Sequence, residues 1–93
     1  MSEIKYNRSD KLRIRCERML VICPEGSLRR VLEHAANSLR YTAPEACDGR
    51  GHVVGLALRQ EHADQLYGGV SDIPPDVMKE MLTLWTEPWR DPS

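Results

Sequence analysis

The sequence contains no phenylalanine, and its aromatic residues are three tyrosines and two tryptophans among 93 residues. The large apolar side chains of a core must therefore come from leucine, isoleucine, valine and methionine. A chain of this length is near the lower end of what folds alone, so such a core is small. We therefore expect part of the stability to come from a partner chain, a homodimer being one form of this.

Long hydrophobic runs are also missing. No apolar run approaches the ~20 residues that a membrane-spanning helix needs, and residues 1–10 are too polar for a secretory signal. The cysteines are few and odd in number, namely Cys16, Cys23 and Cys47. Such cysteine usage is typical of a reducing compartment, so we expect a cytoplasmic protein with no disulfide and no membrane contact.

Neither sign of charge dominates, since 13 Lys and Arg stand against 14 Asp and Glu. The two parts of the chain nevertheless differ. Residues 1–41 hold nine basic and five acidic side chains, a net charge of +4, whereas residues 42–93 hold four basic and nine acidic side chains, a net charge of −5. The asymmetry has two interpretations. Either the two parts of the chain attract each other, which we favour, or the basic part forms a face that binds an acidic partner.

The clearest element is an amphipathic helix over residues 27–40. Its apolar residues recur at three- and four-residue spacing, which places them in one stripe. The stripe consists of Leu28, Val31, Leu32, Ala35, Ala36 and Leu39. We expect Ser27 to cap the first turn after a bend at Gly26, and Arg29 to pair with Glu33 one turn further on.

Residues 9–23 fit two patterns. As a strand, residues 11–16 alternate between basic and apolar side chains. As a helix capped by Ser9 or Asp10, the segment leaves Ile14 and Val21 outside its apolar stripe. That stripe consists of Leu12, Cys16, Met19, Leu20 and Cys23. The helix is favoured because the capped start and the length of the segment suit it.

The middle of the chain carries turn signals. Thr42 and Glu45 have the spacing of a capping box that opens one short turn. The two glycines of residues 48–51 predict a loop. Residues 52–67 fit a helix, with a strand over residues 52–59 as the alternative because a glycine inside a helix costs about 1 kcal/mol relative to alanine.

A last helix is expected to begin near Pro75, which suits its first turn. Its apolar stripe consists of Met78, Met81, Leu82 and Trp85. Together these elements predict a mainly α, compact single domain of three to four helices over residues 1–93. A short two-stranded β element, in an α+β fold, is the alternative, and residues 1–8 and 89–93 are expected to be loosely ordered ends.

No motif indicates catalysis or a metal. Gly49, Gly51 and Gly55 resemble a phosphate-binding loop in spacing, but no strand precedes them, so a plain turn is the better interpretation. Cys47 and His52 come near the spacing of two paired zinc ligands, but nothing pairs Cys23 with His62 to complete a site. No acid is placed to orient His52 as a catalytic base for Cys47. We therefore expect no metal, no cofactor and no enzymatic activity.

The candidate partner-binding residues are arginines of the basic part and the C-terminal Trp-Arg pair. They are Arg13, Arg15, Arg18, Arg29, Arg30, Arg40, Trp89 and Arg90. A tryptophan just beyond a helix end, next to a proline and an arginine, is typical of an interface anchor.

These observations favour a small stand-alone protein that binds another macromolecule, a protein in the first place, as a regulator or inhibitor. Small bacterial and phage inhibitors, anti-CRISPR proteins among them, are of this size, and the analogy is one of size alone. The alternative is a DNA-binding transcriptional regulator. In that case the first two helices form a helix-turn-helix, and the basic N-terminal half contacts nucleic acid.

Overall fold

Residues 5–66 and 73–92 are described by a computed structural model of the protein, with side chains placed in residues 5–62 and 73–92. The helices, in chain order, are α1 (Arg8–Ile22), α2 (Ser27–Leu39), the short 3-10 helix η1 (Pro44–Ala46), α3 (Asp48–Leu66) and α4 (Pro75–Thr86). These residues contain no strand, so the prediction of a mainly α domain is confirmed and the two-stranded alternative is wrong for this part of the chain.

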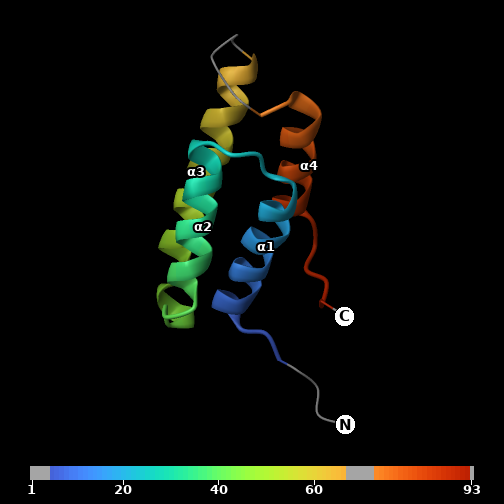
Figure 1. The fold of residues 1–93 in the computed structure, drawn as a ribbon. Coiled ribbons are helices and arrows are strands. Elements are labelled where there is room, and N and C mark those ends of the chain that lie inside the picture. Colours follow the sequence, from blue (N-terminus) through green and yellow to red (C-terminus); the bar gives the residue numbers. More distant parts are fainter. Residues whose placement is uncertain (1–4, 67–72, 93) are drawn as a thin grey trace.

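The four α-helices run alternately up and down (Figure 1). Helix α1 packs against α2 and α4, and α3 packs against the same two helices. The helices therefore close a ring around one core, as in an antiparallel four-helix bundle.

Helix α1 begins with a capping box at Asn7, two or three residues before the predicted caps Ser9 and Asp10. The Asn7 side chain accepts a hydrogen bond from the backbone N–H of Asp10 (2.9 Å), and the Asp10 carboxylate accepts one from the backbone N–H of Asn7 (3.3 Å). Ser9 is buried instead, and its hydroxyl donates to the carbonyl oxygen of Thr42 (2.9 Å), which ties the start of α1 to the α2–η1 loop. The helical interpretation of residues 9–23 is thus confirmed, but neither Ser9 nor Asp10 is the cap.

Helix α2 has the predicted apolar stripe, with Val31 half-buried at its edge and the other members buried. The predicted ion pair between Arg29 and Glu33 is present (Nε to Oε1, 2.9 Å). The cap, however, is Gly26, and the Ser27 hydroxyl donates to the Glu61 carboxylate of α3 (2.9 Å).

The segment after α2 differs most from the prediction. A short turn does form at η1, but its cap is Ala43, and the Thr42 hydroxyl donates to the carbonyl of Ser38 (2.9 Å) rather than capping. Residues 48–51 are the first turn of α3, not a loop, and residues 52–59 continue this helix, not a strand. The plain turn expected from Gly49, Gly51 and Gly55 is therefore wrong as well.

The glycines of α3 are tolerated because the helix gains its stability from packing. Val54 and Leu58 are buried in the core, and Gly51 faces Leu12 and Trp85. A Cβ at Gly51 would lie 3.5 Å from the Leu12 side chain, an ordinary contact, so no steric limit requires glycine there. The intrinsic cost of about 1 kcal/mol per glycine is thus outweighed by tertiary contacts.

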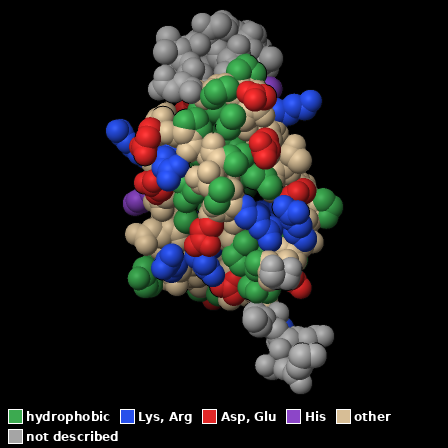
Figure 2. Space-filling model, turned by 45° about the vertical axis from the view of Figure 1, so that its right-hand side comes forward, with side chains coloured by type: hydrophobic (Ala, Val, Ile, Leu, Met, Phe, Trp, Pro, Cys, Tyr) green, Lys and Arg blue, Asp and Glu red, His purple; other side chains and the backbone are tan. Residues whose placement is uncertain are grey.

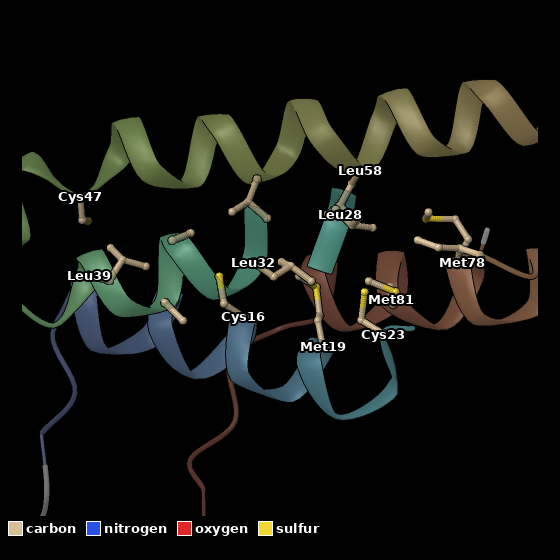
Figure 3. Packing of buried hydrophobic residues seen from close by; sticks show 14 residues of the cluster. Cys16, Met19, Cys23, Leu28, Leu32, Leu39, Cys47, Leu58, Met78 and Met81 are labelled. Atoms are coloured by element: carbon tan, nitrogen blue, oxygen red, sulfur yellow. The ribbon is translucent and has the colours of Figure 1, made fainter. Parts of the chain in front are cut away.

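The core is rich in sulfur and aliphatic groups (Figure 3). Its fully buried side chains are Cys16, Met19, Leu28, Leu32, Cys47, Val54, Leu58, Met78 and Met81. All three helical stripes predicted from periodicity supply members of this set. Trp85 of α4 packs against the set from the side.

The predicted loose ends fall only partly within the described residues. Residues 1–4 and 93 lie outside them. After α4 the chain continues in the direction of α4 and passes beside α1 (Figure 1), and the half-buried Trp89 makes its contacts there.

Candidate partner-binding surfaces

The eight predicted site residues do not form one surface. Arg13, Arg15 and Arg18 lie on α1, Arg29 and Arg30 lie on α2, and Arg40 follows α2 directly. Trp89 and Arg90 follow α4. The contacts of each residue therefore decide which of them are open to a partner.

Arg29 is engaged with the C-terminal end of α1. Its guanidinium donates to the carbonyl oxygens of Leu20 (3.1 Å) and Cys23 (2.6 Å) and pairs with Glu33. Helix α1 has no basic residue in its own last turn. Arg29 supplies the positive charge that unsatisfied carbonyls at a helix C-terminus favour, so its place in the structure is that of a cap.

Arg15 has the same relation to α4. It donates to the carbonyl oxygens of Leu84 (3.1 Å) and Trp85 (3.3 Å), in the last turn of a helix that also lacks a basic residue there. Arg18, one turn further along α1, donates to the carbonyl oxygen of Arg90 (2.9 Å). Through these hydrogen bonds, the two arginines hold the end of α4 and residues 87–92, which we name the C-terminal segment, against α1.

Trp89 of the C-terminal segment also packs against α1. Its ring lies under the Lys11 ammonium (5.5 Å to the centroid) and the guanidinium groups of Arg15 (5.9 Å) and Arg18 (5.4 Å). The Tyr6 ring lies 5.7 Å away at a tilted angle. Cations over the face of an indole are attracted by its quadrupole. One side of Trp89 is therefore occupied by α1, and its use as an interface anchor stays a prediction.

The remaining arginines of the predicted set, Arg30 excepted, are in ion pairs. Arg13 and Arg40 both contact Glu17 (3.1 and 3.7 Å), and Arg90 contacts Glu87 (3.2 Å). Such exposed or half-exposed pairs contribute about 0–1 kcal/mol each, but they reduce the positive charge that these faces present.

The two parts of opposite net charge are joined mainly by contacts other than ion pairs. Among the side chains that the structure describes, those of residues 5–62 and 73–92, Arg8 and Asp48 form an ion pair that links residues 1–41 to residues 42–93. Arg15 and Arg18 instead reach the second part through backbone carbonyls and the Trp89 ring. The favoured interpretation of the charge asymmetry, a mutual attraction of the two parts, stays a prediction.

A groove of about 380 Å³ lies between α2 and α3, on the outside of the ring. Its lining consists of Arg30, Val31, His34 and Ala35 from α2 and of Arg50 and Val53 from α3. We name it the α2–α3 groove. Two valines and an alanine form the apolar part of this lining, and two arginines and a histidine form the polar part. The lining contains no carboxylate.

Arg30 and Arg50 are exposed, and their guanidinium groups have no partner among the described residues. Val53 is 50% exposed, and Leu56, three residues further along α3, is 49% exposed. Arg50, Val53 and His34 were not among the predicted site residues. The signal that could have found Arg50 and Val53 is the three-residue spacing along α3, which the expectation of a loop over residues 48–51 concealed.

Other faces carry mixed charges. Figure 2 looks onto the side of the molecule where α4 and the C-terminal segment lie in Figure 1, and shows positive, negative and hydrophobic side chains interspersed over it. Val21 on α1 is 85% exposed, as its position outside the α1 stripe predicts. It lies in a shallow groove together with both Arg18 and Glu17.

The cysteines are buried thiols. Burial, followed by the nearby charge of Glu17, raises the pKa of the Cys16 thiol from 9.0 to about 12, and burial also raises the pKa of Cys23. Because the thiolate is the reactive form, neither is activated as a nucleophile. Cys47 is fully buried at the start of α3, whereas His52 is exposed, so the structure does not bring these two side chains to one site.

No group of three or more His, Cys, Asp or Glu side chains that could hold a metal ion occurs within the described part of the chain. No helix in the same part is long and apolar enough to cross a membrane. Comparisons with known proteins find no matching family model, no similar curated protein and no similar solved structure.

Proposed function

We propose that this protein acts by binding another protein, as a regulator or inhibitor, and that it does so through the α2–α3 groove. The supporting observation is that Arg30 and Arg50, whose guanidinium groups find no partner in the described structure, lie beside an apolar lining without a carboxylate. Arginine is enriched in the core of protein interfaces, and exposed apolar surface between charged groups is typical of them. The other predicted arginines serve contacts within the molecule.

A DNA-binding regulator is the second candidate, because α1 and α2 are joined by a short turn as in a helix-turn-helix. Its recognition helix would be α2, with Arg29, Arg30 and Arg40 at the duplex. Arg29 is held by the end of α1, and Arg40 contacts Glu17 on the α1 side of α2. Of these three arginines, Arg30 alone has no internal partner among the described residues, which favours a protein over a duplex.

The experiment that tests the proposal separates these two candidates. Tagged protein is isolated from the cells that produce it, with and without nuclease, and retained proteins are identified by mass spectrometry. We expect one protein to be retained in a stoichiometric amount and to resist nuclease.

In parallel, fluorescence anisotropy of a labelled short duplex is measured between about 50 and about 200 mM salt, where phosphate-mediated binding changes steeply. We expect no saturation at micromolar protein. Salt-sensitive binding at low micromolar concentration, or retention of proteins only in the absence of nuclease, would overturn the proposal and promote the DNA-binding function.

A further inference from the structure

We infer that the α2–α3 groove receives an acidic amphipathic helix of the partner protein. In this arrangement apolar side chains of that helix cover Val31, Ala35 and Val53, and its carboxylates pair with Arg30 and Arg50. The inference rests on the proposed function and names the chemistry of the partner, which the proposed function leaves open.

The first argument is charge. Arg30 comes from α2 and Arg50 from α3, so positive charge is supplied by both helices that bound the groove, and no carboxylate of the lining offsets it. His34, one helical turn after Arg30, adds a third group that can donate to an anion. Arginine pairs with carboxylates through two parallel N–H···O bonds, which makes it suited to such a partner.

The second argument is the apolar surface. Val31 is half-buried, Ala35 is buried and Val53 is half-exposed, so the groove has an apolar lining that a phosphate backbone could not use. Leu56 lies one turn beyond Val53 on α3 and extends the exposed apolar surface past the groove. An occupant that covers Val53 and Leu56 together is longer than the groove itself, which favours a segment of a protein over a small molecule.

The third argument is shape. Helices α2 and α3 are antiparallel neighbours, and the space between two such helices runs along their axes. The Ser27 hydroxyl donates to the Glu61 carboxylate of α3 (2.9 Å), a contact that joins the start of α2 to α3. A third helix can lie in such a groove with residues at i, i+3, i+4 and i+7 facing inward.

A second copy of this chain is a poorer occupant. A two-fold symmetric contact through the α2–α3 groove would place Arg30 and Arg50 of one copy against the same arginines of the other. With no carboxylate in the lining, like charges would meet without compensation. The groove therefore favours a different chain, whose helix carries the opposite charge.

The test uses the full chain and a synthetic model helix. The probe carries leucines at i, i+3, i+4 and i+7 with glutamates on both flanks, and binding is followed by amide NMR shifts of the isotope-labelled protein. We expect the largest shifts at Arg30, His34, Arg50 and Val53. A second probe with lysine in place of each glutamate should bind at least about tenfold more weakly.

Charge-reversal variants show whether the groove itself is responsible. The double variant Arg30→Glu/Arg50→Glu should lower the affinity for the glutamate probe at least about tenfold. The matched control is Arg59→Glu, since Arg59 is an exposed arginine of α3 that has no partner within the described part of the chain and lies outside the groove lining. It should change the affinity less than about twofold. Circular dichroism confirms that each variant is folded.

Three results would overturn the inference. These are shifts confined to other faces, an equal loss from Arg59→Glu, and self-association of the free chain that the double variant abolishes. The proposed function fails separately, when the wild-type chain retains no protein from its own cells. If the partner is retained equally by the double variant, the function stands and this assignment of the site is wrong.

Discussion

Arg29 and Arg30 are neighbours on α2, but their side chains lie on different sides of the molecule and differ in their contacts. Arg29 faces α1 and donates to two carbonyl oxygens at the end of that helix. Arg30 instead lies in the α2–α3 groove, and its guanidinium has no partner among the residues that the structure describes. The same contrast holds between the α1–α4 side, where Arg15 and Arg18 donate to backbone carbonyls, and the α3 side, where the described residues offer Arg50 no partner. A run of arginines in a sequence therefore does not define a basic surface.

The physical cause is the composition of the helix ends. None of the four α-helices carries a basic residue in its last turn, so the carbonyls there have no cation of their own. In α1 and α4, arginines from neighbouring helices satisfy them, which couples helix capping to tertiary packing. Arg30 and Arg50 serve no helix end in the described part of the chain, and both line the α2–α3 groove.

The largest expected effect comes from the core that both sides share. Leu32 is a fully buried residue of α2, so Leu32→Ala should lower the free energy of unfolding by about 2–5 kcal/mol. The loss should destabilise the α1–α4 side and the α3 side together. Val53→Ala, at the half-exposed edge of the groove, should cost about 0.5 kcal/mol or less. Urea unfolding curves measure both changes. An unchanged midpoint for Leu32→Ala would remove α2 from the shared core.

The next effect tests the comparison directly. Arg29→Met keeps an unbranched side chain but removes the donors to the carbonyls of Leu20 and Cys23, so we expect a loss of about 1–2 kcal/mol. Arg30→Met is the matched control, and it should stay within about 0.5 kcal/mol of the wild type. The free energy of unfolding is again the measured quantity. Equal losses would show that the two arginines are not in different roles.

Most of the fold can be predicted from the sequence because it depends on periodic burial. The stripes of α1, α2 and α4 are visible as apolar spacing, and each supplies the core as expected. The start of helix α3 is hard to predict from the sequence because Gly49, Gly51 and Gly55 have a low helix propensity. The burial of Val54 and Leu58 in the core outweighs this local preference.

The candidate site is much less accessible to sequence reasoning. Arg29 and Arg30 have the same chemistry and adjacent positions, so no local pattern says which of them faces α1. Contacts such as Arg15 with the end of α4 join residues 69 and 70 positions apart, beyond the range of any motif. The sequence indicated that arginines matter, whereas the structure shows which of them the fold already uses.

The smallest effect concerns Trp89, whose substitution should lower the stability of the α1 side but leave binding in the α2–α3 groove unchanged. On the α1 side its ring is held by three cations and Tyr6, so Trp89→Ala should lower the free energy of unfolding by about 1 kcal/mol. Trp89→Phe keeps an aromatic face and should lose about half of that. Because Trp89 is outside the α2–α3 groove, neither variant should weaken binding of the acidic model helix by more than about twofold. The measurements are urea unfolding and the NMR titration of each variant. A variant that unfolds like the wild type but releases the cellular partner much faster would show that Trp89 is an interface anchor, and the partner would then contact the α1 side instead.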